Sequence, residues 1–110
     1  MATPSCAIYS ATKAAVTMLT KSMALEFAQL NNHIRVNCIC SGMVPGTNLV
    51  QGITPQLVEK AVAMMATRNI LKHRAIEPAD VAHGVLFLSS PLSEMITGQT
   101  LVIDQGFCAT

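Results

Sequence analysis

Residues 34–46 read IRVNCICSGMVPG, and this stretch decides the fold. Its first seven residues are rich in apolar and β-branched side chains and do not alternate cleanly between apolar and polar. That pattern is typical of a short strand covered on both faces, as in a parallel sheet. The glycines and the proline of residues 41–46 predict a loop. The stretch therefore predicts a buried strand over residues 34–40 that ends in a loop.

Regular elements are predicted on both sides of this strand. Residues 8–30 carry two apolar lines at helical spacing and contain no proline or glycine, which predicts a long helix buried on two sides. TLVID, residues 100–104, predicts a second strand of the buried type.

Two further helices are predicted between the strands. Thr54 and Pro55 form an N-cap and first-turn pair that begins a helix to about Arg68. Pro78 begins the next helix, and Asp80 in its first turn is favourable to the helix dipole. The first of these helices is expected to bury five apolar residues: Leu57, Val58, Ala61, Val62 and Met65.

The order helix, strand, helix, helix, strand indicates an α/β fold with a parallel sheet. The 110 residues suffice for one domain. Two strands, however, do not make a sheet that is stable alone. The predicted fold class is therefore α/β, with about three helices and two strands of an incomplete parallel sheet.

Composition narrows the classes of function. The chain is 51% hydrophobic and 12% charged, with a net charge of +1, so no electrostatic preference for nucleic acid or an anionic membrane is expected. No apolar run approaches the ~20 residues of a membrane span. The first residues lack the pattern of a signal peptide, which favours a cytoplasmic location.

The cysteines raise the alternative of a metal site. Cys38 and Cys40 point to one face of the predicted strand, and His33 lies nearby. The spacing matches no zinc pattern well, so buried, reduced thiols are the favoured interpretation and no metal is expected.

Tyr9 and Lys13 lie in YSATK, at the start of the long predicted helix. Residues four apart on a helix lie about 6 Å apart on one face. A free tyrosine has a pKa of about 10, and a fixed ammonium nearby favours the phenolate. Such a phenol can give a proton to a carbonyl oxygen or take one from an alcohol. The motif alone is weak, and by itself it favours a solvated lysine and a packed tyrosine.

Four blocks of the sequence together resemble the carboxyl-terminal half of the short-chain dehydrogenase/reductase family. They are YSATKAAVTMLTKSMALEFA, IRVNCICSGMV, EPADVAHGVLFLSS and ITGQTLVIDQG, and their order and spacing match over nearly the whole chain. The resemblance implies that residues 1–110 are the carboxyl-terminal half of a single Rossmann-type domain, part of a doubly wound parallel sheet. It also implies an oxidoreductase that interconverts a carbonyl and an alcohol with NAD or NADP. Tyr9 would then be the acid/base, and Lys13 would activate it and hydrogen-bond the ribose of the cofactor.

The loop after the predicted strand resembles the segment that wraps the nicotinamide end of the cofactor in this family. The family pattern is Pro-Gly-x-Val/Ile-x-Thr. Gly42 and Val44 match it, whereas Ser41 replaces the proline and Thr47 comes one position late. The resemblance implies cofactor contacts for Gly42, Val44 and Thr47. An ordinary strand-to-helix loop is the alternative.

Two other regions are informative by comparison with the family. Residues 48–75 correspond to its variable substrate region. Ile103-Asp104-Gln105-Gly106 stands where the family usually has Val-Asp-Gly-Gly. Asp104 and its neighbours are expected to be structural, at a subunit contact, rather than catalytic.

Parts of the family's site have no counterpart within these residues. The glycine-rich turn that holds the cofactor phosphates, and a serine roughly a dozen residues before the tyrosine, both fall before Met1. The isolated chain is therefore expected to be unstable and inactive. The expected partners are a small carbonyl or alcohol substrate and a homo-oligomer or full-length family subunit. The alternative is a truncated, non-catalytic isoform that associates with such subunits through the long helix.

Overall fold

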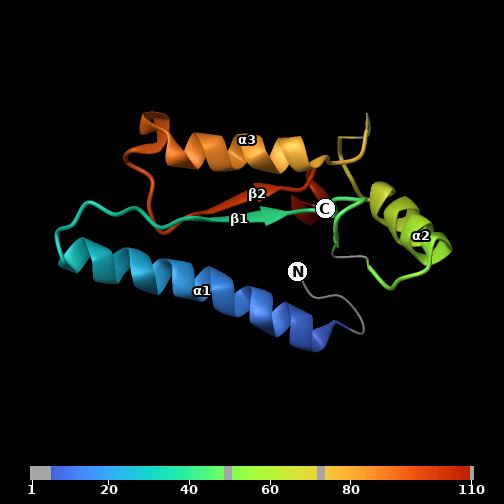
Figure 1. Ribbon diagram of the computed structural model, residues 1–110, viewed down its shortest axis with the longest axis horizontal. Helices are drawn as coiled ribbons and strands as arrows, with labels where there is room; N and C mark the ends of the chain where they lie inside the picture. Colours follow the sequence, from blue (N-terminus) through green and yellow to red (C-terminus); the bar gives the residue numbers. More distant parts are fainter. Residues whose placement is uncertain (1–5, 49–50, 72–73, 110) are drawn as a thin grey trace. The chain divides into compact units, whose positions relative to one another are not determined.

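The structure is a computed structural model that describes residues 6–48, 51–71 and 74–109. Along the chain the elements are helix α1 (Ala7–Gln29), strand β1 (Cys38–Ser41), helix α2 (Pro55–Ala66), helix α3 (Pro78–Ser89), the 3-10 turn η2 (Pro91–Ser93), strand β2 (Thr100–Ile103) and the 3-10 turn η3 (Phe107–Ala109) (Figure 1). This order confirms the predicted α/β class. The starts of the three helices, the ends of α1 and α2, and both ends of β2 lie within two residues of those predicted.

Strands β1 and β2 pair with each other in a two-stranded sheet. The N–H of Gly98 donates to the carbonyl of Val36 at 2.7 Å, and the N–H of Gly42 donates to the carbonyl of Ile103 at 2.8 Å. The residue numbers rise together along both strands, so the pairing is parallel. A parallel pair needs a long crossover connection, and α2 and α3 lie within it. Among the described residues, each strand has one paired edge and one open edge.

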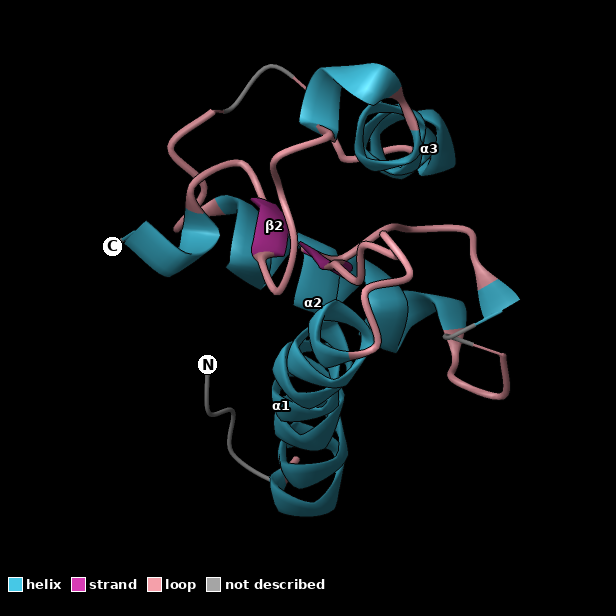
Figure 2. Cartoon of the chain, turned by 90° about the vertical axis from the view of Figure 1, so that its left-hand side faces the viewer, coloured by secondary structure: helices cyan, strands magenta, loops and turns pink. Residues whose placement is uncertain are grey.

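The chain divides into two compact units. The first consists of Met1–Ile39 and Val85–Leu101, and the second of Cys40–Gly84 and Val102–Thr110. Within the first unit, α1 and the carboxyl end of α3 lie on opposite sides of the paired strand segments (Figures 1 and 2). Among the described residues, the buried hydrophobic side chains are Ala24 in the first unit and Ile76 in the second, each 6% exposed.

Strand β1 begins at Cys38, whereas the sequence predicted a strand from Ile34. Side chains reinforce the backbone pairing of the chain just before Cys38. The side-chain amide of Asn37 donates to the carbonyl of Ile96 at 2.8 Å and accepts from the N–H of Gln99 at 3.0 Å. The Asn37 side chain therefore bridges the two chain segments beside the backbone bond from the Gly98 N–H to the Val36 carbonyl.

Arg35 supports the same part of the first unit. Its guanidinium donates to the carbonyl of Leu88 at 2.9 Å and to the hydroxyl of Ser93 at 3.0 Å. Ser93 is 1% exposed, and its hydroxyl also donates to the carbonyl of Phe87 at 2.9 Å. The last carbonyls of a helix have no partners within the helix, and a cation is favourable there. Arg35 thus caps the carboxyl end of α3.

The predicted burial of the helices is wrong for the described residues. No residue of α2 is buried, Leu57 is 57% exposed, and the other four predicted side chains are half-buried. The buried residues of α1 are Thr20 and Ala24, while six large apolar side chains of α1 and its end are at least half exposed: Ile8, Val16, Met18, Leu19, Leu25 and Leu30. Two strands offer too little surface to cover three helices.

We predict that the isolated 110-residue chain does not unfold cooperatively as a monomer. Fully burying one large apolar side chain contributes about 1.5–3 kcal/mol, and most such side chains here are left in water. A urea melt followed by circular dichroism, with sedimentation to report mass, is the measurement. A single cooperative transition of a monomer would show that the expectation is wrong.

Candidate functional site

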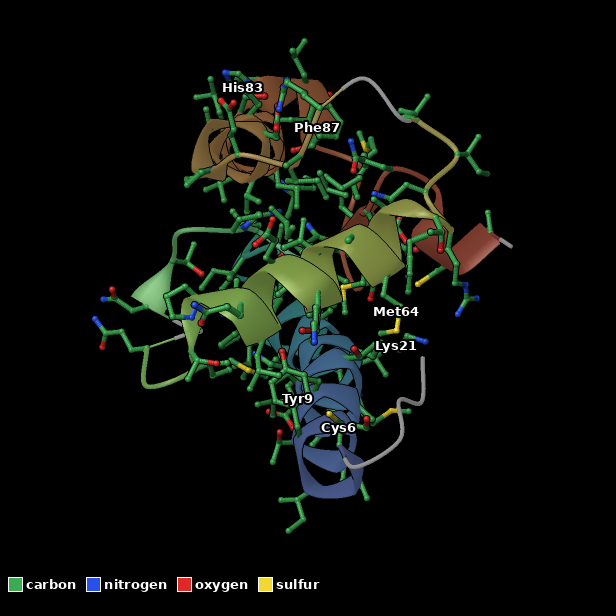
Figure 3. The ribbon with its side chains drawn as sticks, turned by 90° about the vertical axis from the view of Figure 1, so that its right-hand side faces the viewer. Cys6, Tyr9, Lys21, Met64, His83 and Phe87 are labelled. Atoms are coloured by element: carbon green, nitrogen blue, oxygen red, sulfur yellow. The ribbon has the colours of Figure 1, made fainter. Side chains whose placement is uncertain are left out.

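The candidate acid/base pair lies in the first turns of α1. Tyr9 and Lys13 are four residues apart, and the Lys13 Nζ lies 5.4 Å from the centroid of the Tyr9 ring. Tyr9 is 50% exposed, and it projects from the same end of α1 as Cys6, with Lys21 farther along the helix (Figure 3). The helix therefore places a cation against the aromatic ring and leaves the phenol accessible.

The groups of this pair suit a polar ligand that carries hydroxyl and carbonyl oxygens. A phenol both donates and accepts a hydrogen bond, and an ammonium offers three donors. The Thr12 hydroxyl donates to the Tyr9 carbonyl at 2.7 Å, and the Thr17 hydroxyl donates to the Lys13 carbonyl at 3.3 Å, so both threonines bond back to the helix. The phenol and the ammonium at this end of α1 are exposed, so both can hydrogen-bond the oxygens of a polar ligand.

The predicted cofactor loop belongs to the second unit, whereas Tyr9 and Lys13 belong to the first. A Cβ at Gly42 would lie 2.9 Å from the Ile76 side chain and 3.1 Å from the Asp104 Cα. Close packing therefore favours glycine at position 42, which is a structural reason that the sequence did not reveal.

Thr47 and Val44 are joined within the loop. The Thr47 hydroxyl donates to the carbonyl of Val44 at 3.1 Å, and both residues are half-buried. The bond makes the loop after β1 a closed turn. A cofactor contact by this hydroxyl would have to coexist with that bond or replace it.

An ion pair joins Arg74, which precedes α3, to Asp80 in the first turn of α3, at the edge of a cavity in the second unit. The cavity has a volume of about 400 Å³, and its lining includes Leu71, Ile76 and Val102. The two guanidinium nitrogens of Arg74 bind the two oxygens of Asp80 at 2.6 Å each. The Arg74 hydrogen bonds, followed by the N–H of Glu77, hold the pKa of the Asp80 carboxyl far below its usual range.

Asp104 follows β2 and is 9% exposed. Burial acts to raise the pKa of this carboxyl, but the N–H groups of Cys108 and Gly106, at 2.8 and 2.9 Å, outweigh it and lower the pKa. The carboxylate thus satisfies two backbone donors of the turn at η3. This arrangement supports the structural role expected for Asp104.

Gln105 is a residue whose role the sequence did not reveal. It has a φ of 57°, in the left-handed region that favours glycine. The sequence feature that pointed to this conformation was its place in IDQG, where the family that the chain resembles has glycine.

The cysteines differ from the expected buried pair. All four are free thiols; Cys38 is half-buried and Cys40 is exposed. Over residues 6–48, 51–71 and 74–109, no group of three or more histidine, cysteine or acidic residues could hold a metal ion. In that same part of the chain, no helix combines the length and the apolarity needed to cross a membrane.

Comparison with known proteins identifies the family. A family model described as enoyl-(acyl carrier protein) reductase matches residues 1–108. Short-chain dehydrogenase anuF of Penicillium roqueforti is 43% identical over 108 residues, which cover 96% of this chain and 37% of that relative. The 3-oxoacyl-[acyl-carrier-protein] reductase FabG of Chlamydia pneumoniae is 40% identical over 98 residues, which cover 89% and 36%. The chain belongs to the short-chain dehydrogenase/reductase family.

Solved structures agree with this assignment. A 4-hydroxyisoleucine dehydrogenase complexed with NADH matches with a TM-score of 0.79 and 34% identity, and the match covers 100% of this chain and 42% of that one. The described elements are thus part of a Rossmann-type fold, as predicted. The chain spans about two fifths of the length of the relatives it matches.

We predict that the Arg74–Asp80 pair makes stability depend on pH in the acid range. The pKa of Asp80 is lowered by folding, so its contribution is complete above the unfolded value of roughly 3.9 and is lost as the pH falls below it. In the protein expressed from its complete reading frame, Asp80→Asn should lower the urea midpoint at pH 7 but have a smaller effect at pH 3. Glu59→Gln, an exposed change on α2, is the control. An equal difference at both pH values would contradict the role of this carboxylate.

Proposed function

We propose that these residues supply the acid/base pair of an NAD(P)-dependent oxidoreductase that interconverts a carbonyl and an alcohol. The observation that carries the proposal is the Tyr9–Lys13 pair, with the ammonium against an accessible phenol, on the first turns of α1 in a chain of this family. Residues 1–110 would form the carboxyl-terminal half of a single Rossmann-type domain, which agrees with the share of each relative that they cover.

The proposed proton transfer takes place at the Tyr9 oxygen. In reduction, the Tyr9 hydroxyl gives its proton to the carbonyl oxygen of the substrate; in oxidation, the phenolate takes the proton of the alcohol. Lys13 is the proposed activator of Tyr9, and its Nζ lies 5.4 Å from the centroid of the Tyr9 ring. Such a positioned acid or base contributes about 10²–10⁴ in rate.

The cofactor proposed is NAD or NADP. When bound, it supplies or accepts the hydride at the substrate carbon, because no side chain can do so. Lys13 would hydrogen-bond its ribose, and Gly42, Val44 and Thr47 would contact its nicotinamide end. The NADH bound to the matching 4-hydroxyisoleucine dehydrogenase supports this choice. The cofactor phosphates would be held by residues outside these 110, so the isolated chain is proposed to be inactive.

We predict that Tyr9→Phe lowers kcat by about 10²–10⁴ in the protein expressed from its complete reading frame. The phenyl ring keeps the packing of Tyr9 and removes the transferable proton. Lys13→Met should also lower kcat, whereas Lys21→Met, which removes an exposed lysine farther along α1, should not. The measurement is steady-state NAD(P)H oxidation with a panel of ketones. Activity within twofold of the unchanged protein in Tyr9→Phe would refute the proposed role.

A second candidate function is association with full-length subunits of the family, without catalysis. The exposed apolar side chains of α1 favour it, because a row of such side chains on one helix is a typical interaction surface. Homo-oligomerisation through the same helix is the corresponding proposal for an active enzyme.

We predict that Leu19→Glu, which puts a charge on this exposed surface, weakens such association at least tenfold. Leu19 is 57% exposed, and a buried unpaired carboxylate is unfavourable in an apolar interface. Sedimentation of the protein with and without a co-expressed family subunit measures the effect. Glu26→Gln on the same helix is the control. Unchanged assembly of the Leu19 variant would exclude this surface as the interface.

A further inference from the structure

We propose that Gln105 is a positioning residue that latches the segment 69–71, which follows α2, onto the turn after β2. The turn consists of residues 104–108, and both parts belong to the second unit. The latch fixes the carboxyl end of the α2 arm, residues 51–71.

The backbone of Gln105 indicates that its conformation is maintained by its contacts. Its φ is 57°, and the φ of the next residue, Gly106, is 80°. Glycine adopts this region freely, whereas a side chain makes it strained. Strained residues persist where the surrounding contacts over-determine them.

Both the backbone and the side chain of Gln105 make those contacts. Its carbonyl accepts from the N–H groups of Ile70 and Leu71 at 2.9 and 3.1 Å. Its side-chain oxygen accepts from the Asn69 amide at 2.7 Å, and its side-chain nitrogen donates to the Arg74 carbonyl at 2.6 Å. One residue therefore bonds four others that lie about thirty positions earlier in the chain.

Packing next to Gln105 completes the latch. A Cβ on Gly106 would lie 2.8 Å from the Ile70 side chain, so Ile70 lies directly on this glycine. The Arg68 guanidinium lies over the Phe107 ring, 4.7 Å from its centroid. The two residues that follow Gln105 thus contact the residues on both sides of Asn69. The segment is held by its neighbours as well as by hydrogen bonds.

The latch holds the α2 arm in place, because the packing of the arm itself is too weak to do so. No residue of α2 is buried, so the helix has little packing to fix its position. The hydrogen bonds at residues 69–71 hold the end of the arm instead. Under the proposed function, on which this step rests, the arm lies in the substrate region, so the latch would affect substrate binding more than proton transfer at Tyr9.

Hydrogen exchange in the protein expressed from its complete reading frame tests the latch. Gln105→Gly keeps the left-handed backbone and removes both side-chain bonds. Gln105→Asn also tolerates that backbone, but its amide is one methylene too short to reach. In both variants the Ile70 and Leu71 amides should exchange about tenfold faster. Loss of the side-chain hydrogen bonds makes local opening of this segment easier by roughly the net contribution of one hydrogen bond. The Gly42 amide should exchange as before, and Gln29→Ala, at the exposed end of α1, is the control.

Unchanged exchange at Ile70 and Leu71, or an equal increase at Gly42, would overturn the latch. Should the Gln105 variants fail to fold, Asn69→Ala removes one side-chain bond and should produce the same local effect. In turnover assays, KM for the ketone should rise several-fold in Gln105→Asn while kcat stays within twofold. Faster exchange with an unchanged KM would overturn the link to substrate. Absence of turnover in the unchanged protein would count against the proposed function, while the exchange result would still decide the latch.

Discussion

The parallel pairing of β1 with β2 is the interaction on which the rest of the described structure depends. The two strands are distant in sequence, so α2 and α3 must lie in the connection between them. Side-chain bonds reinforce the pairing where the ladder is short. Asn37 bridges the chain before β1 to the chain before β2, and Arg35 ties the same region to the end of α3.

The same pairing explains why so much apolar surface is exposed. A two-stranded sheet is narrow, and the helices of an α/β fold take most of their stability from a broad sheet. Ala24 and Ile76 are the buried hydrophobic residues described, one in each unit. The sequence is nevertheless apolar enough for its helices and strands to be covered on several sides. The relatives are more than twice as long, so their additional residues could provide such cover. The composition of the chain thus suits a larger sheet than the two strands among its described residues provide.

In the candidate site, some contacts follow from spacing within one helix, and others depend on residues far apart in the sequence. The spacing of Tyr9 and Lys13 placed both on one helix face, and the structure confirms that they are neighbours. The glycine at position 42 was interpreted as a cofactor contact. The structure shows that a Cβ there would crowd Ile76 and Asp104, and neither is close to Gly42 in sequence. Packing by itself accounts for glycine at this position. A cofactor contact by Gly42 therefore stays a prediction.

The sequence by itself determined the order and type of the elements, because helical spacing, proline positions and β-branched runs are local properties. It also determined the family, through four blocks that agree in order. Tertiary structure alone decided where β1 begins, which glycine needs close packing, and why Gln105 adopts a left-handed backbone. Each of these depends on a partner dozens of residues away, such as Ile96 for Asn37 or Asn69 for Gln105. No local pattern records such a partner, because it becomes a neighbour only when the strands pair.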